Sequence, residues 1–178
     1  MNKTLKILLI VALVLGVVLF ALSKYYSQLR SEPIDINTNS GSELSAETKP
    51  NKYIIVNLSN KGLTTLTSEM FNKDKNCEEL NVSNNNLTGA LPAEIRLMSN
   101  LKLINASNNN LTGIPAEIGQ LKQLEVLDLS NNKIDTMPNE IENIKENLKI
   151  LNIKGNTYSK ESIENIKKML PDTLVVSD

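Results

Sequence analysis

The sequence contains no histidine and no tryptophan, and it has a single cysteine, Cys77. Without histidine there is no Ser-His-Asp triad, no histidine general base and no histidine-ligated metal. A lone cysteine excludes an intramolecular disulfide and a thiolate metal cluster. Aromatic residues make up 3% of the chain, so it offers few of the large anchors that dominate tight interfaces. These absences argue against an enzyme and predict no cofactor and no metal.

An excess of either charge is also missing, because 19 basic residues face 20 acidic ones. A nucleic-acid surface requires a basic patch or stripe, so nucleic acid is not an expected partner. The length of 178 residues allows one domain plus an appendage.

One long apolar run is present, at residues 7–22. Lysines flank it on both sides: Lys3, Lys6 and Lys24. A membrane-spanning helix needs about 17–25 residues, and a basic N-terminal tail favours a cytoplasmic N-terminus. We therefore predict a single-pass signal-anchor helix at residues 1–26, with the rest of the chain outside the cytoplasm. The alternative is a signal peptide cleaved after the small residues Ala21 and Ser23, which would release a secreted protein.

Residues 27–52 are polar, with few apolar side chains. Such a stretch buries too little surface to fold alone. We interpret it as a flexible linker.

The remainder, residues 53–178, carries a repeat. Its clearest unit, residues 124–134, reads L-x-x-L-x-L-x-x-N-x-I. Pairs of aliphatic or small residues with this spacing recur every 23 or 24 residues: Val56/Leu58, Leu80/Val82, Ile104/Ala106, Leu127/Leu129 and Leu151/Ile153. One unit cannot bury its apolar side alone, so the pattern predicts five short strands stacked around a shared core.

The C-terminal part of this array is atypical. Residues 159–170 have helical periodicity, with Ser159 as a candidate N-cap and Pro171 as the terminator. The pair Leu174/Val176 then predicts a half-repeat with both side chains in the core. Helix and half-repeat together are expected to cap the array.

Residues 53–158 resemble the leucine-rich repeat family. Residues 87–95 and 111–119 are similar to the L-T-G-x-I/L-P subtype of plant receptor ectodomains and bacterial surface proteins. The resemblance implies a curved α/β solenoid with short parallel strands on its concave face. It also implies a protein-binding role, and it supplies no catalytic residue.

Several positions recur with the repeat. An asparagine follows each strand after the first, where its amide is expected to bond to turn and neighbouring backbone as a buried ladder: Asn85, Asn109, Asn132 and Asn156. A proline begins each return segment as the start of a short helical turn: Pro92, Pro115 and Pro138. Cys77 falls at a leucine position and is expected to fill the core.

Strand positions between the core residues should form columns on the concave face. The first column is mostly apolar: Ile55, Glu79, Leu103, Val126 and Ile150. The second consists of amides and one acid: Asn57, Asn81, Asn105, Asp128 and Asn152. The third is mostly hydroxyl: Ser59, Ser83, Ser107, Ser130 and Lys154. The first two columns are the predicted protein-binding site.

Two functions remain in competition. In the first, a membrane-anchored, extracytoplasmic module binds a protein or peptide through the concave face, since exposed apolar patches mark interaction sites. In the second, the columns only reflect repeat duplication, and the chain is a structural or self-associating surface protein without a dedicated ligand. A hydrolase is disfavoured, because the recurring acids Glu94, Glu117 and Glu140 suit the first turns of short helices.

Overall fold

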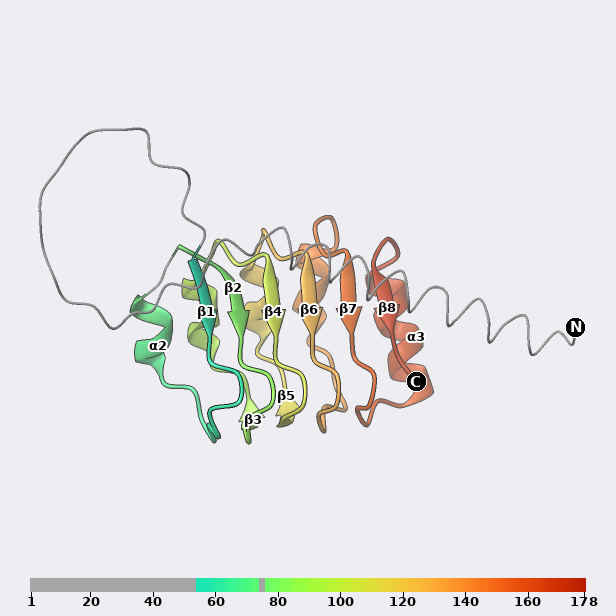
Figure 1. Cartoon of the computed structure of the whole chain (residues 1–178). Coiled ribbons are helices and arrows are strands. Elements are labelled where there is room, and N and C mark those ends of the chain that lie inside the picture. Colours follow the sequence, from blue (N-terminus) through green and yellow to red (C-terminus); the bar gives the residue numbers. More distant parts are fainter. Residues whose placement is uncertain (1–53, 74–75) are drawn as a thin grey trace, which may run out of the picture. The chain divides into compact units, whose positions relative to one another are not determined.

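The computed structural model describes residues 54–73 and 76–178 (Figure 1). All of them belong to one compact unit of the chain, residues 49–178. The predicted signal-anchor helix and linker lie outside the described residues. Among the helices that are described, none has both the length and the apolar character needed to cross a bilayer.

The repeats form one six-stranded parallel sheet with strand order β1-β2-β4-β6-β7-β8. One strand comes from each successive repeat, so the predicted parallel solenoid is confirmed. Figure 1 shows these strands side by side, with the short helices behind them. The strands are β1 (Ile54–Asn57), β2 (Cys77–Asn81), β4 (Leu103–Asn105), β6 (Val126–Asp128), β7 (Ile150–Asn152) and β8 (Leu174–Val176).

The predicted core positions are in register from strand to strand. Val56 is level with Leu80, Leu80 with Ile104, and the alignment continues through Leu127 to Leu151. From Leu80 onward these side chains are buried in a single core that runs the length of the array. Cys77 is fully buried in the same core, as expected.

The predicted register of the last strand is wrong by one residue. Val175, not Leu174, is level with the core residue Leu151, and Leu174 is 41% exposed. A slip of one residue exchanges the two faces of a strand. Residues 174–176 are all apolar, so alternation gave no signal. Thr173, just before the strand, is buried, and its Oγ1 donates a 2.7 Å hydrogen bond to the Leu148 carbonyl.

The return segments contain short 3₁₀ helices, each preceded by the predicted proline: η1 (Ala93–Leu97), η2 (Ala116–Gln120) and η3 (Asn139–Ile144). Each helix buries an isoleucine in the core: Ile95, Ile118 and Ile141. In the first repeat the α-helix α2 (Ser68–Lys73) precedes β2. The L-T-G motifs add a feature that was not predicted, a two-stranded parallel sheet of β3 (Thr88–Ala90) and β5 (Asn110–Gly113).

The predicted C-terminal helix is confirmed as α3 (Lys160–Met169). The Ser159 hydroxyl accepts a 3.1 Å hydrogen bond from the Ser162 N–H and caps its first turn. Ile166 and Leu170 are buried on its inner side and belong to the core cluster. The helix therefore closes the last layer of the array.

Candidate functional site: the concave face of the repeat sheet

The asparagine ladder fixes the turns that end the concave strands. Asn109 is representative: its Oδ1 accepts from the Leu87 N–H at 3.0 Å, and its Nδ2 donates to the carbonyls of Val82 and Ala106 at 3.1 and 3.2 Å. Each amide thereby joins its own turn to the preceding repeat. Asn85, Asn132 and Asn156 make the equivalent bonds, so the predicted ladder is confirmed.

The second column is held in place by its own chain. In Asn81 the Oδ1 atom accepts from both the backbone N–H and the hydroxyl of Ser83, at 3.1 and 2.8 Å. The same pair of bonds recurs between Asn105 and Ser107, and between Asp128 and Ser130. Because these bonds use the oxygen, the side-chain N–H groups of Asn81 and Asn105 make no hydrogen bond to another described residue. They remain available as donors.

The third column is not the hydroxyl surface that the repeat suggested. Ser83, Ser107 and Ser130 are buried, and each hydroxyl donates to the residue two positions before it. The serines therefore hold the side chains of the second column in place. Sequence spacing placed them on the right side of the strand, but it carried no information about these local bonds.

The first column differs along its length. Ile55 on β1 is 43% exposed, whereas Glu79 and Leu103 are 7% and 1% exposed. Val126 and Ile150 are intermediate. The expected exposure is therefore wrong at Leu103 and Glu79. Leu103 stands in register between Glu79 and Val126, in the interior of the sheet, where it has a strand neighbour on each side.

The first column has a sixth member that was not predicted. Leu174 is in register with Ile150 and is exposed, because of the one-residue difference in β8. No signal for it is present in the sequence, because residues 174–176 are all apolar. The column therefore ends with an exposed aliphatic side chain on each outer strand, β1 and β8.

A row of charges runs beside the first column. The Lys102 ammonium lies 2.7 Å from the Glu78 carboxylate, and Lys149 is paired with Glu125. Glu79 differs from these acids, because its side-chain carboxylate makes no hydrogen bond or ion pair with another described residue. Burial raises the pKa of the Glu79 carboxyl above its ordinary value. It is the least solvated acid of this face.

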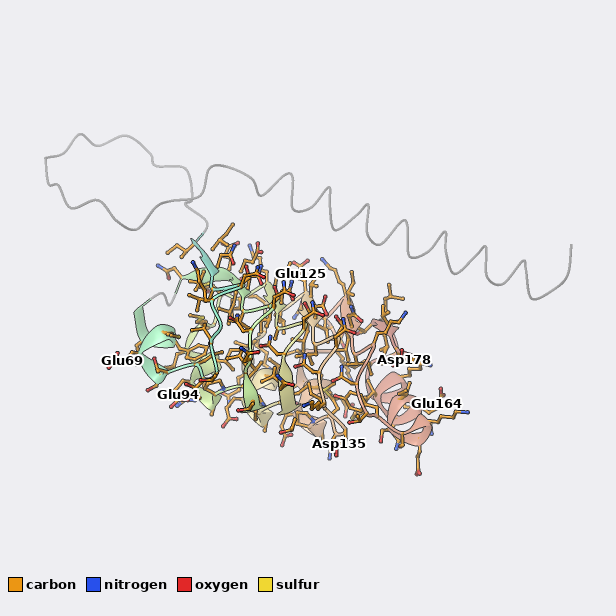
Figure 2. The ribbon with its side chains drawn as sticks, turned by 60° about the horizontal axis from the view of Figure 1, so that its bottom comes forward. Glu69, Glu94, Glu125, Asp135, Glu164 and Asp178 are labelled. Atoms are coloured by element: carbon orange, nitrogen blue, oxygen red, sulfur yellow. The ribbon has the colours of Figure 1, made fainter. Side chains whose placement is uncertain are left out.

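The acids of the described residues are spread over the array. Within residues 54–73 and 76–178, no group of three or more Cys, Asp or Glu side chains is placed to hold a metal ion. Figure 2 shows Glu125 at one side of the array and Glu94 and Asp135 at the opposite side. The recurring acids Glu94 and Glu117 lie in the first turns of η1 and η2, as the dipole argument expected.

Family comparison agrees with this geometry. A model described as two copies of leucine-rich repeats matches residues 99–146, and a single leucine-rich repeat model matches residues 76–98. These segments span β2 to η3, so this part of the chain is a leucine-rich repeat array. Comparison with curated protein sequences finds no match.

Solved structures with the same fold include bacterial and plant proteins. A leucine-rich repeat protein of Leptospira interrogans is 42% identical, with a TM-score of 0.60 over 63% of this chain and 28% of that protein. The Arabidopsis receptor kinase HAESA ectodomain, solved with the peptide hormone IDA, is 29% identical, with a TM-score of 0.55 over 64% of this chain and 19% of that one. The plant peptide hormone receptor RGFR1, in complex with RGF2, is 31% identical, with a TM-score of 0.53 over 64% of this chain and 18% of that one. The chain thus spans less than a third of the length of each.

Proposed function

We propose that the repeat domain binds a protein or peptide partner through its concave face. The observation that carries this proposal is the geometry of the second column. The side chains of Asn81 and Asn105 are immobilised through their oxygens, while their N–H donors stay free. Preorganised donors lose little conformational entropy on binding. The half-buried Val126 and Ile150 supply apolar surface beside them.

The comparisons support the same proposal at the level of the fold. Two of the structural neighbours, HAESA and RGFR1, are receptors solved with peptide hormones. Leucine-rich repeats typically serve binding rather than catalysis, which agrees with the composition of this chain. The predicted contact residues are Ile55, Asn57, Glu79, Asn81, Asn105, Val126, Asp128, Ile150 and Asn152, with Leu103 contributing little surface.

Charge substitution on the concave face tests the proposal. Val126→Glu combined with Ile150→Lys leaves the net charge unchanged but places two charges among the apolar contacts, where an unpaired charge is costly to bury. We expect capture of a partner from envelope extracts to fall at least about tenfold, because a loss of roughly 1.4 kcal/mol in binding free energy weakens the affinity tenfold. The matched control is Thr88→Glu combined with Thr112→Lys, at exposed positions of the second sheet. Equal capture by both variants would remove the concave face as the binding site.

We further propose that residues 7–22 anchor this module in a membrane with the repeats outside the cytoplasm. The apolar run and its flanking lysines support the anchor, and the receptor ectodomains among the structural neighbours support an extracellular module. Intact mass measurement of the protein recovered from membranes tests the proposal. Retention of Met1 to Ser23 is expected, and a mass that lacks them would instead indicate secretion after cleavage.

A second candidate function is self-association, and one observation favours it. The two exposed large aliphatic residues of the described chain, Ile55 and Leu174, lie on the two outer strands of the sheet. Exposed strand edges with apolar side chains tend to pair with other chains. Analytical ultracentrifugation separates the two functions, because a self-associating protein sediments faster as its concentration rises, whereas a strict monomer would contradict this candidate.

A further inference from the structure

We propose that Glu79 binds a lysine or arginine side chain of the partner, so that the concave face selects an extended segment with a cation followed three residues later by an apolar residue. This inference rests on the proposed function and specifies the chemistry of the partner.

The first observation is that Glu79 stands without a counterion. Its side chain is 7% exposed, and none of the described residues donates a hydrogen bond to it. The neighbouring acids are different: Glu78 is paired with Lys102, and Glu125 is paired with Lys149. Lys102, which precedes the neighbouring strand β4, is therefore already engaged by Glu78. A carboxylate that is taken out of water without a partner is destabilised, so an incoming cation gains more at Glu79 than at the paired acids.

The second observation is the setting of Glu79. Its register neighbours in the first column are Ile55 on one side and Leu103 on the other. Asn81 follows two positions later on the same face of β2. A cationic side chain placed there would have apolar surface for its stem, and the carboxylate and the Asn81 side chain beside its head. Lysine and arginine both combine an apolar stem with a charged head.

The spacing of the strands determines which other residues of the partner segment reach the first column. Val126 lies two strands from Glu79 in register, with Leu103 between them. Neighbouring strands are about 4.8 Å apart, so these positions are separated by roughly 9.6 Å. In a polyproline II segment, residues three apart lie on the same face, about 9.3 Å from one another. Leu103, on the strand between them, is 1% exposed and has almost no surface for a contact.

A segment that crosses the strands would therefore place its cation at Glu79 and its next inward residue at Val126. A third inward residue would reach Leu174, which continues the column two further strands on and is exposed. The pattern expected in the partner is cation-x-x-apolar-x-x-apolar.

The test uses the full chain and four fluorescein-labelled proline-rich peptides. The first anchor position is lysine, arginine, glutamine or glutamate, with leucine three and six residues later and proline elsewhere. Fluorescence anisotropy gives the affinity of each peptide. We expect the lysine and arginine peptides to bind about tenfold more tightly than the glutamine peptide, as a charge-assisted hydrogen bond implies. The glutamate peptide should bind most weakly.

Two variants assign the preference to one carboxylate. Glu79→Gln should abolish the difference between the lysine and glutamine peptides. Glu94→Gln removes the same charge on η1, away from the concave face and without breaking an ion pair, and is the matched control, in which the preference should persist. Glu79→Lys should reverse the order and favour the glutamate peptide, which an effect of misfolding would not do.

The outcomes separate this inference from the proposed function. If all four peptides bind equally and the Val126→Glu, Ile150→Lys variant loses this binding, the cation site would be overturned and binding at the concave face would be supported. A lysine preference that survives Glu79→Gln, or no binding of any peptide, would also overturn the cation site. If the Val126→Glu, Ile150→Lys variant captures the partner as well as the wild type does, the proposed function itself would be overturned.

Discussion

At the scale of single residues, the buried asparagines could be predicted and the exposure of the concave side chains could not. An amide that recurs at one position after each strand has a clear use, since a turn leaves backbone groups unpaired. Strand alternation, in contrast, tells which side Leu103 is on but not how much solvent reaches it. The predicted columns placed Leu103 between Glu79 and Val126, as observed, but a register does not tell how closely the neighbouring side chains cover it.

The ladder predicts a large loss of stability at a small polar residue. Asn109→Ala removes an acceptor from the Leu87 N–H and donors from the Val82 and Ala106 carbonyls. Both carbonyls keep a bond from the asparagine of a neighbouring repeat, so the Leu87 N–H alone is left without a partner. A buried group in that state costs about 1–3 kcal/mol, and a loss of this size in the free energy of unfolding is expected. Urea denaturation measures it. Asn86→Ala, at an exposed asparagine of the preceding repeat, is the control and should change the stability by less than about 0.5 kcal/mol.

Glu79 predicts a specific dependence of stability on pH. Burial raises its pKa above the ordinary value of 4.5, so the folded protein holds this proton more tightly than the unfolded chain does. The free energy of unfolding therefore falls as the pH rises from 4.5 to the raised pKa, and it stays lower above that pKa.

Substitution by glutamine removes this titration while conserving the shape of the side chain. Glu79→Gln is expected to raise the Tm at about pH 7 and to have little effect at about pH 4, where the wild-type carboxyl is mostly protonated in both states. Thermal unfolding at the two pH values checks the difference. Equal shifts at both values would mean that packing, rather than charge, explains the effect.

At the scale of elements, the regular repeats could be predicted and the irregular ones could not. Strands β2, β4, β6 and β7 follow from the spacing of their leucines, and η1 to η3 follow from their prolines. Strand β8 was misaligned, because residues 174–176 are apolar throughout and a two-residue period is needed to identify the buried side. The β3–β5 sheet was missed, since its strands are three and four residues long and have no alternating pattern.

The close packing of η2 against η3 predicts a strong effect of one added methyl group. Gly119 on η2 faces the backbone of η3, and a Cβ there would lie 2.8 Å from the carbonyl carbon of Glu140. A backbone carbonyl cannot move aside as a flexible side chain can. Gly119→Ala is therefore expected to reduce the free energy of unfolding by about 1–3 kcal/mol, the usual cost of overpacking.

A nearby glycine provides the matched control for this measurement. At Gly113, on β5, an added Cβ would meet only the Ala90 side chain, at an ordinary 3.7 Å. Gly113→Ala should leave the denaturation midpoint nearly unchanged or raise it slightly. Similar losses for the two variants would show that helix packing is not the cause of the Gly119 effect.

At the scale of the whole molecule, stability depends on sealing the ends of a linear core. Each repeat contacts its neighbours only, so the last layer would be open to water without a cap. Ile166 and Leu170 of the C-terminal cap close that layer. The cap could be predicted, because the apolar periodicity of residues 159–170 indicated a helix with a polar outer face. No comparable pattern in this chain identifies the partner of the concave face.

The cap predicts that one charge on α3 destabilises the array. Ile166→Asp places a carboxylate among core side chains and should lower the free energy of unfolding by roughly 3–5 kcal/mol. The control is Asn165→Asp, which adds the same charge at the adjacent, exposed position of the helix. Urea denaturation gives the two stabilities, and binding of a hydrophobic dye reports the opened layer. If both variants were equally stable, α3 would be an appendage, and the core would have to end at β7 without it.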